Sequence, residues 1–453
     1  MNETTTHQRT RMSRHAWRGL LLAGGLWLGW QAVCANMADH HLQRAGEGER
    51  EDVEAALWWQ PDHPRALTLQ ARWLQRDGDT RTAEDALRRA VTANPADARP
   101  LAELARLRAA AGNEALADDM MDTAHRLMPV HPGVQQNIGF YWLQRGEPAR
   151  GITHVATALS GDYRLKDRFF PLLLAAAEDP ALRGALQPLA ADPPSWWTSF
   201  FEQASRMAKS ADSVAALLQM RAAAKGVPVS EREREALLQR LYRDGRVADA
   251  YLLWMNSLDE TGLQRLGYVF DGGFEGPLAN GGFGWFGNVP RNAGFRISTG
   301  VTWGVTGERA VHIGFSGKRA RFQHLYQNLF LGPGRYEVSG QFRPDALRAR
   351  RGLQWRVHCN AGGSQLLGES EFLLEGNEWR RFAFDVEVPA DCAGQVLRLY
   401  SGGNRDVDHE LQGGAWFDAM RIARKPEAQP IWGNNGESER SSRTSLASDK
   451  PAG

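Results

Sequence analysis

The chain has 453 residues, which at about 100–200 residues per domain predicts two or three domains, and its 42% hydrophobic residues can form sizeable cores. Its 54 basic and 53 acidic residues leave a net charge of +1, which argues against nucleic acid as a partner because phosphate binding requires a basic excess. Three cysteines exclude a disulfide-rich scaffold and a four-cysteine zinc site.

Residues 1–35 have the pattern of an export signal. A polar, arginine-containing start precedes an apolar run at 19–30, and small residues follow up to Ala35. This order is typical of a secretory signal peptide cleaved after Ala35, and the alternative is an uncleaved membrane anchor. Both predict an exported protein that is either periplasmic or anchored in the inner membrane with its bulk in the periplasm.

Residues 36–265 are predicted to form a helical solenoid. Turn-forming and small residues recur every 34 positions, as in Pro61, Pro95 and Pro129, in Gly78, Gly112 and Gly146, and in Ala56, Ala90, Ala124 and Ala158. Glycine suits the turn between two helices, proline ends the second helix, and alanine lets helices approach closely. The segment 161–265 is interpreted as degenerate repeats that close the same solenoid.

The 34-residue period resembles the tetratricopeptide repeat, which is a stack of helical hairpins. The resemblance implies that a protein partner binds in the groove of the solenoid. The alternative is a spacer that holds the C-terminal domain away from the membrane.

The composition changes at Tyr268, where helical periodicity stops and glycine and aromatic residues become frequent. Apolar and polar residues then alternate in short runs such as 353–359 and 379–388, a pattern typical of strands with one buried face. The turn signal Gly332-Pro-Gly334 stands before another such run. Residues 266–425 are therefore predicted to form an antiparallel β-sandwich of the jelly-roll type, so that the fold class is multidomain, α then β.

Three segments of this region resemble carbohydrate-binding modules of the family 4/9 type, which are galactose-binding-like sandwiches. They are Gly272-Gly-Phe-Glu275 with a later Gly-Trp285, the segment 327–336, and Gly413-Gly-Ala-Trp-Phe-Asp418. The resemblance implies glycan binding, in which aromatic rings stack on a sugar and polar side chains bind its hydroxyl groups. The candidate sugar-binding residues are Trp285, Phe286, Trp303, Arg319, Arg321, Gln323, Tyr326 and Gln327. The alternative is that these aromatic residues belong to the core.

The resemblance also implies a structural calcium ion, with Glu275 and Asp418 as its carboxylate ligands. The alternative for Asp418, which lies in phase with apolar residues, is an arginine or backbone amide partner. If Cys34 is lost with a signal peptide, Cys359 and Cys392 remain, and two cysteines in an oxidising compartment are expected to pair. The alternative for these two is a pair of buried free thiols.

The sequence lacks GxSxG, P-loop, HExxH and CxxC motifs, and we expect no enzymatic activity and no required cofactor. The domain pair predicts an exported cell-envelope protein that couples protein binding to glycan binding, as an accessory in making or exporting a surface polysaccharide. One alternative is an assembly scaffold whose sandwich binds protein. Another is a carbohydrate-active hydrolase, which needs two facing carboxylates. The polar residues 426–453 are predicted to be a disordered tail.

Overall fold

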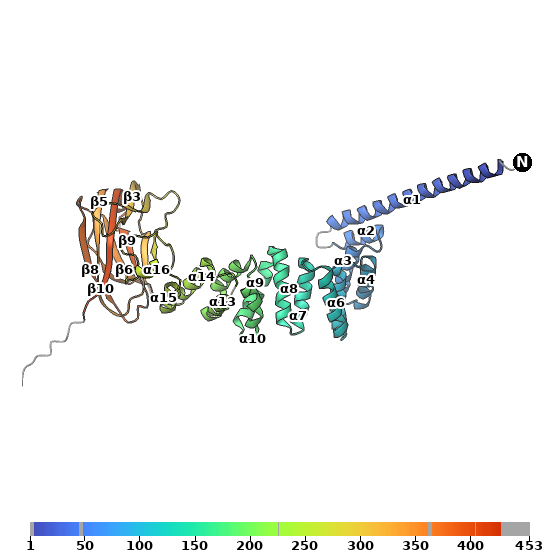
Figure 1. The fold of residues 1–453 in the computed structure, drawn as a ribbon, viewed down its shortest axis with the longest axis horizontal. Helices are drawn as coiled ribbons and strands as arrows, with labels where there is room; N and C mark the ends of the chain where they lie inside the picture. The colour runs from blue at the N-terminus through green and yellow to red at the C-terminus, as the bar shows by residue number, and fades with distance from the viewer. Residues whose placement is uncertain (1–3, 45–48, 225, 361–364, 404, 427–453) are drawn as a thin grey trace, which may run out of the picture. The chain divides into compact units, whose positions relative to one another are not determined.

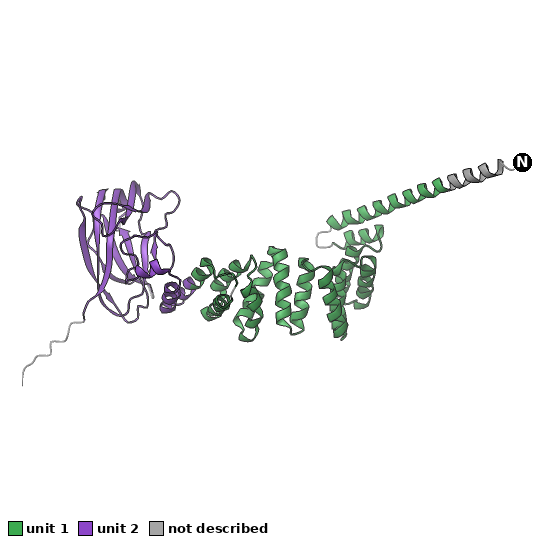
Figure 2. Ribbon diagram, in the orientation of Figure 1, with its two compact units in different colours: residues 1–237 green, residues 238–453 purple. Residues whose placement is uncertain are grey.

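The computed structural model describes residues 4–44, 49–224, 226–360, 365–403 and 405–426. Helices come first along the chain and antiparallel strands follow, so the predicted fold class is correct (Figure 1). The chain divides into two compact units, residues 1–237 and residues 238–453 (Figure 2). Most of the predicted tail, residues 427–453, lies outside the described residues.

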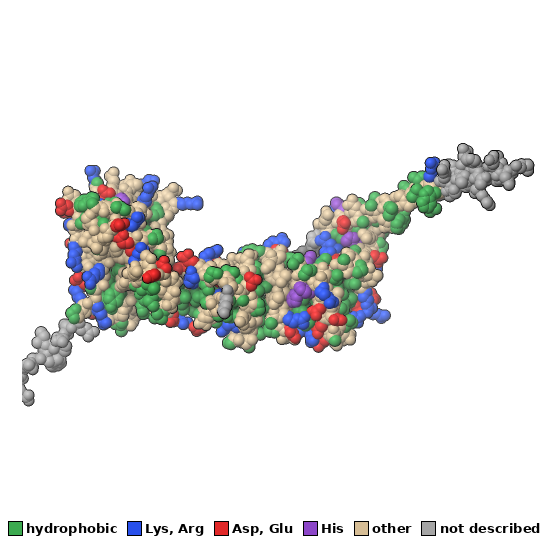
Figure 3. Space-filling view, viewed as in Figure 1, with side chains coloured by type: hydrophobic (Ala, Val, Ile, Leu, Met, Phe, Trp, Pro, Cys, Tyr) green, Lys and Arg blue, Asp and Glu red, His purple; other side chains and the backbone are tan. Residues whose placement is uncertain are grey.

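Helix α1 (Thr4–Arg44) contains residues 4–35 of the predicted signal or anchor, and residues 1–3 lie outside the described residues. Its segment Trp17–Arg44 is long and apolar enough to cross a membrane, a test that a signal sequence also passes. Figure 3 shows hydrophobic side chains at the surface of this helix. Leu20 and Leu22 are exposed. Farther along α1, Ala38 and Leu42 are buried in a small core with residues of the next two helices.

The hairpins of the solenoid follow the predicted 34-residue period. After α2 (Arg50–Trp59), the paired helices are α3 (Pro64–Arg76) with α4 (Thr80–Ala93), α5 (Ala98–Ala110) with α6 (Glu114–Leu127), and α7 (Pro132–Gln144) with α8 (Pro148–Gly161). Gly78, Gly112 and Gly146 occupy the three turns with φ values of 86°, 84° and 76°. A side chain is disfavoured at these angles, which explains why glycine recurs there.

The remaining helices are shorter and less regular. They are η1 (Tyr163–Leu165), α9 (Lys166–Glu178), α10 (Pro180–Arg183), η2 (Gly184–Leu186), α11 (Gln187–Ala191), α12 (Trp197–Met207), α13 (Ala211–Ala223) and α14 (Glu231–Arg243). A buried ion pair connects two of them, because Arg221 Nε lies 3.1 Å from Glu233 Oε1. The indole of Trp197 also donates to Glu233, at 2.8 Å, so this carboxylate organises the end of the helical region.

The strands form two five-stranded antiparallel sheets in the described residues. Sheet A has the order β1 (Trp285–Phe286), β4 (Leu325–Leu329), β9 (Gln395–Ser401), β6 (Leu353–Cys359) and β7 (Leu366–Glu369). Sheet B has the order β2 (Phe295–Val301), β3 (Arg309–Arg319), β10 (Glu410–Arg424), β5 (Gly334–Arg348) and β8 (Arg380–Val388), with η3 (Asp406–His409) before β10.

The core of unit 2 takes one face of each strand and includes Trp355, Phe342 and Phe417. Cys359 and Cys392 are joined in a disulfide with a Cα–Cα distance of 5.7 Å, so the predicted pairing is confirmed. It links the end of β6 to the segment before β9 in sheet A.

The last helices belong to the same compact unit as the sandwich. Helices α15 (Val247–Met255) and α16 (Glu260–Gln264) follow the division after residue 237, whereas the sequence placed the domain boundary after residue 265. The reason lies in aromatic packing, because Tyr251 and Trp254 of α15 contact Phe283 with ring centroids 5.1 and 5.6 Å away. A helix that buries its apolar face on a sandwich has the same periodicity as one that buries it in a solenoid.

Candidate functional site

Two of the predicted sugar-binding residues lie in the core of unit 2. Trp285 is 2% exposed and Gln327 is 1% exposed. The Trp285 ring packs beside Phe274, and its indole donates to the Asp271 carbonyl at 3.1 Å. The Gln327 amide donates to the Phe270 carbonyl and accepts from the Phe270 amide, each at 2.9 Å. These contacts correct the assignment of both residues, because strands β1 and β4 turn their side chains inward and away from any sugar.

The neighbouring residues on these two strands face outward and begin a row across sheet A. The register places Phe286 opposite Tyr326, Tyr326 opposite Arg398, Arg398 opposite Arg356, and Arg356 opposite Glu369. We call these five residues the sheet A row. They come from five strands and lie side by side because facing residues of antiparallel strands point to the same side of a sheet.

Ring and charge contacts order the sheet A row. The rings of Phe286 and Tyr326 are stacked, with centroids 4.6 Å apart and planes within 1°. The guanidinium carbon of Arg398 lies 4.4 Å from the Tyr326 ring centroid, and Arg398 Nε is buried without a hydrogen-bond partner in the described structure. At the other end, Arg356 Nε lies 3.1 Å from a Glu369 oxygen. The row thus combines apolar rings with hydrogen-bond donors.

More polar side chains flank the row on the same face. Arg356 lies over the Tyr400 ring at 5.3 Å, and the His358 ring is 5.7 Å from that of Tyr400. Burial, together with the positive charges of Arg356 and Arg398, lowers the pKa of His358. A neutral imidazole both donates and accepts hydrogen bonds, which suits the recognition of hydroxyl groups.

The sheet A row ends in a cavity of about 670 Å³. It is lined by Arg350, Arg351, Gln354, Arg356, Glu369, Phe372, Gly403, Arg405 and Asp408. Since Arg356 and Glu369 belong both to the row and to the cavity, a ligand on the row reaches the cavity without leaving the protein surface. The sequence singles out Phe286 and Tyr326 but gives no sign of Arg356 and Arg398, because their strands are distant from both in the chain.

Three other candidates lie away from the row. Arg319 ends strand β3 of sheet B and pairs with Glu410 at 2.7 Å. Arg321 and Gln323 are exposed in the connection between β3 and β4. The structure therefore does not bring these three side chains into the sheet A row.

Trp303 belongs to a different surface, on the outer side of sheet B. Its side chain is 63% exposed, and the Arg343 guanidinium lies 4.7 Å from its ring centroid. Arg343 also lies 5.4 Å from the Trp379 ring and 5.6 Å from the Trp416 ring. His312 stands opposite Trp416 in the register and stacks beside it at 4.4 Å. We call Trp303, Trp379, Trp416 and Arg343 the sheet B cluster.

Glu275 and Asp418, the predicted calcium ligands, lie near each other. Asp418 is 0% exposed, and one of its oxygens, Oδ2, accepts from the Thr306 amide at 2.7 Å. The other, Oδ1, has no hydrogen-bond partner among the described residues. Burial and the charge of Glu275 raise the pKa of Asp418, although backbone hydrogen bonds oppose the shift. A buried carboxylate oxygen without a partner is costly unless a cation or a proton occupies it.

The surroundings of Asp418 fit a calcium ion. A Cβ atom on Gly273 would lie 3.8 Å from both Asp418 Oδ1 and the Thr306 carbonyl oxygen, so these two oxygens border the same space. Calcium prefers carboxylate and carbonyl oxygens. In the part of the chain that the structure describes, no three His, Cys, Asp or Glu side chains gather as a metal cluster. Backbone carbonyls would therefore have to complete a coordination shell that starts from Asp418 Oδ1 and Glu275, whose Oε1 already accepts from the Glu308 and Arg309 amides at 2.9 and 3.2 Å.

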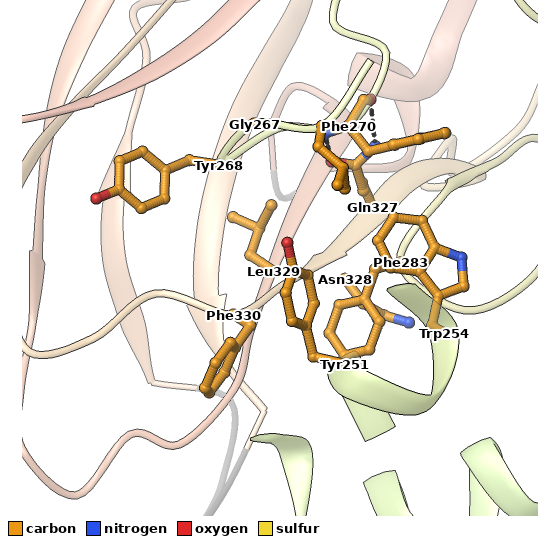
Figure 4. A pocket seen from close by; sticks show the side chains of 11 residues that line it. Tyr251, Trp254, Gly267, Tyr268, Phe270, Phe283, Gln327, Asn328, Leu329 and Phe330 are labelled. Atoms are coloured by element: carbon orange, nitrogen blue, oxygen red, sulfur yellow. Dashed lines mark hydrogen bonds between the residues drawn. The ribbon is translucent and has the colours of Figure 1, made fainter. Parts of the chain in front are cut away.

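An aromatic pocket of about 480 Å³ lies within unit 2 where α15 meets the sandwich. Figure 4 shows Tyr251, Trp254 and Phe283 close together, with Phe330 beside Tyr251 and the hydrogen-bonded Gln327 and Phe270 above them in the view. The Tyr251 and Phe330 rings are 5.3 Å apart. This packing attaches the last helices to the end of sheet A near β4.

Unit 1 has a cavity of about 370 Å³ between α3 and α5, the first helices of successive hairpins. It is lined by Arg65, Thr68, Leu69, Arg72, Trp73, Arg76 and Arg99. Two of these arginines, both partly exposed, pair with buried carboxylates of the solenoid, Arg72 with Glu103 at 3.0 Å and Arg99 with Asp97. The cavity thus offers an aromatic ring amid positive charge.

No protein-family model and no curated protein matches the chain. A structure described as "CBM4 structure and function" is 16% identical with a TM-score of 0.26, over 35% of this chain and 99% of its own. TmCBM61 in complex with beta-1,4-galactotriose is 17% identical with a TM-score of 0.24, over 35% and 99%. Pseudomonas aeruginosa pilF is 15% identical with a TM-score of 0.26, over 52% and 90%. The first two are similar to the β part, and the third is similar to the helical part.

Proposed function

We propose that unit 2 binds a glycan on the outer face of sheet A. The observation that carries this proposal is the sheet A row, in which Phe286, Tyr326, Arg398, Arg356 and Glu369 follow one another in register. Neighbouring strands lie about 4.8 Å apart, so five strands give the row a length of about 19 Å. Such a length suits several linked sugar units. Apolar ring surface beside planar donors is the combination that sugar rings and hydroxyl groups require.

Calorimetric titration of the full chain against a polysaccharide panel tests this proposal. We expect saturable binding that falls about ten-fold or more in Tyr326→Ala, because loss of this ring also removes the surface on which Phe286 and Arg398 rest. Trp303→Ala is the matched control, since it removes a larger and more exposed ring from the other sheet. Loss of binding in Trp303→Ala with retention in Tyr326→Ala would assign the site to sheet B instead.

The solenoid is proposed to bind a protein partner through the cavity between α3 and α5. Trp73 supplies apolar contact, and the arginines beside it favour an acidic segment. A photo-crosslinking residue in place of Leu69 should capture one protein in the native cell, and capture should fail when Trp73→Ala is added. The same crosslinker at Thr92, an exposed position of α4, is the control. Equal capture of the same protein from both positions would contradict a role for the cavity.

We further propose that the protein is exported, non-enzymatic and an accessory in surface polysaccharide synthesis or export. The apolar segment of α1 and the Cys359–Cys392 disulfide support export, because disulfides persist in oxidising compartments. Whether α1 is cleaved or stays as an anchor is tested by the N-terminal sequence of the mature protein. A structural calcium ion bound by Glu275 and Asp418 is part of the same proposal.

Two alternative functions predict different outcomes. A scaffold whose sandwich binds protein would show no glycan binding by the folded chain. A hydrolase would release reducing ends from a bound polysaccharide and lose this activity in Glu369→Gln. Against a hydrolase, both carboxylates that line the cavity are engaged within the protein, Glu369 with Arg356 and Asp408 with the Arg405 amide.

A further inference from the structure

We infer that the sheet A site takes an acidic polysaccharide, and that the cavity at the end of the sheet A row holds a carboxylate or sulfate group of that chain. The inference rests on the proposed glycan binding by sheet A, and it adds the chemical class of the ligand. It is carried by the side chains that line the cavity and not by the net charge of the protein, which is only +1.

Positive charge dominates the cavity. Four of its lining residues are arginines, and two are carboxylates. The four arginines are Arg350, Arg351, Arg356 and Arg405. An arginine guanidinium presents paired donors that match the two oxygens of a carboxylate, a geometry that a neutral hydroxyl group cannot use fully.

The two carboxylates of the cavity are already engaged. Glu369 lies 3.1 Å from Arg356 Nε, and Asp408 Oδ2 accepts from the Arg405 backbone amide at 3.2 Å. The Asp408 contact uses a backbone group, so the side-chain charge of Arg405 is not consumed by it. Arg351 lies over the Phe372 ring at 5.6 Å, which orients its side chain, and its guanidinium makes no hydrogen bond to another described residue, so its donors are left for a ligand. The cavity therefore retains more cationic donors than its own carboxylates can satisfy.

The excess of cationic hydrogen-bond donors continues along sheet A. Arg398 of the sheet A row adds a guanidinium whose Nε is buried without a partner in the described structure. Its neighbour across the strands is Arg356, so two like charges face each other in the register, and Glu369 is paired with only one of them, Arg356. Like charges in facing positions are unfavourable in a bare protein. An acidic chain laid along the row would offset this repulsion, whereas a neutral chain would leave it in place.

The test compares polymers that differ in charge only. The full chain is titrated with polygalacturonate and with its carboxyl-reduced, neutral form, and separately with dextran sulfate and with dextran. We expect each anionic polymer that fits to bind at least ten-fold more tightly than its neutral partner at low salt, with a preference that shrinks as salt rises. Preference for polygalacturonate assigns the cavity to carboxylates, and preference for dextran sulfate assigns it to sulfates.

Arginine variants then test whether the preference for the anionic polymer depends on the cavity. The double variant Arg351→Gln/Arg405→Gln should lose most of the preference for the anionic polymer while binding of the neutral form changes less than two-fold. Arg335→Gln, which removes an exposed arginine of sheet B, is the matched control and should keep the preference.

Two results would overturn the inference, and they differ from failure of glycan binding itself. Equal binding of charged and neutral polymers would show a glycan site without charge selection. A preference for the anionic polymer that survives in the double variant and is lost in Arg335→Gln would place the charge-selective site outside the cavity. Absence of binding to every polymer by the folded chain would instead contradict the proposed function.

Discussion

The two outer faces of the sandwich carry the same kinds of residue but use them differently. On sheet B, the cation of Arg343 lies within 5.6 Å of three indole rings and donates to Thr302, so its neighbours are the protein's own side chains. On sheet A, Arg398 contacts the ring of Tyr326 and stands in a row that leads to a cavity lined by further arginines. The Nε atoms of Arg343 and Arg398 are both buried without a hydrogen-bond partner among the described residues, so what distinguishes sheet A is the arginine-lined cavity that its row reaches.

The largest effect on polysaccharide binding is expected from replacing the central arginine of sheet A, compared with the same replacement on sheet B. Arg398→Met is expected to weaken polysaccharide binding about ten-fold or more, because charge-assisted hydrogen bonds are among the strongest polar contacts. Calorimetric titration measures the change. The matched variant Arg343→Met should bind as the natural chain does. If both variants lose affinity equally, the contrast between the faces is wrong.

The second effect concerns Asp418 on sheet B. Calcium at 100 times its dissociation constant stabilises a folded state by about 2.7 kcal/mol, which for a unit of this size raises Tm by about 5–10 °C. In chelator, Asp418→Asn should unfold at a higher temperature than the natural chain, because the raised pKa of Asp418 means that its ionised form destabilises the fold above that pKa. The variant should also lose the response to calcium.

Thermal unfolding of both proteins with calcium and with chelator measures this second effect. Glu308→Gln, which alters an exposed carboxylate near the site, is the control and should keep the full calcium response. A calcium response in Asp418→Asn equal to that of the natural chain would contradict the proposed site.

A smaller effect is expected from pH. Burial, Arg356 and Arg398 lower the pKa of His358, while Glu369 opposes the shift. His358 is thus neutral at pH 7 and gains its charge only below its usual range near 6.5. Binding of an acidic polysaccharide should strengthen as pH falls through that pKa, until the carboxyl groups of the polymer themselves become protonated.

Titrations at several pH values in His358→Gln identify the group responsible, since this variant should show no strengthening. The stability of the free protein should change with the opposite sign. A lowered folded-state pKa means that the unfolded chain takes up the proton first, so acidification destabilises the fold. His312→Gln on sheet B is the comparison that should leave binding unchanged.

The smallest effect is expected from the exposed ring of sheet B. Trp303→Ala should lower the free energy of unfolding by about 1 kcal/mol or less, because the ring is mostly in solvent and its main contact is a cation–π contact with Arg343. Chemical denaturation followed by tryptophan fluorescence measures it. A loss of several kcal/mol would mean that the sheet B cluster is part of the core.

The sequence was most informative where a local rule governs the backbone. The recurring Gly78, Gly112 and Gly146 predicted the hairpin turns because only glycine readily takes their left-handed angles. Alternation in 353–359 predicted a strand that buries Trp355 and Cys359, and both side chains are buried. Helix α15 was placed in the solenoid instead, because its apolar period does not reveal whether a helix or a sheet covers it.

Only part of the candidate site could be predicted from the sequence. Strand β1 has two residues, too few for alternation to show that Trp285 turns inward and Phe286 outward. The resemblance therefore grouped Trp285 and Trp303 as exposed candidates, although one is in the core and the other lies on sheet B. The arginines of β6 and β9 carried no signal of their own, since alternation marks an outward residue without telling what stands beside it.

The sequence by itself determined the local features of this protein: helical hairpins with glycine turns, strands with one buried face, and two cysteines able to pair. Only the tertiary structure decided that Tyr326, Arg398 and Arg356 lie side by side and that Arg343 is surrounded by three tryptophans. The physical reason is that periodicity depends on each strand alone. Register, by contrast, depends on how strands far apart in the chain pair and pack together.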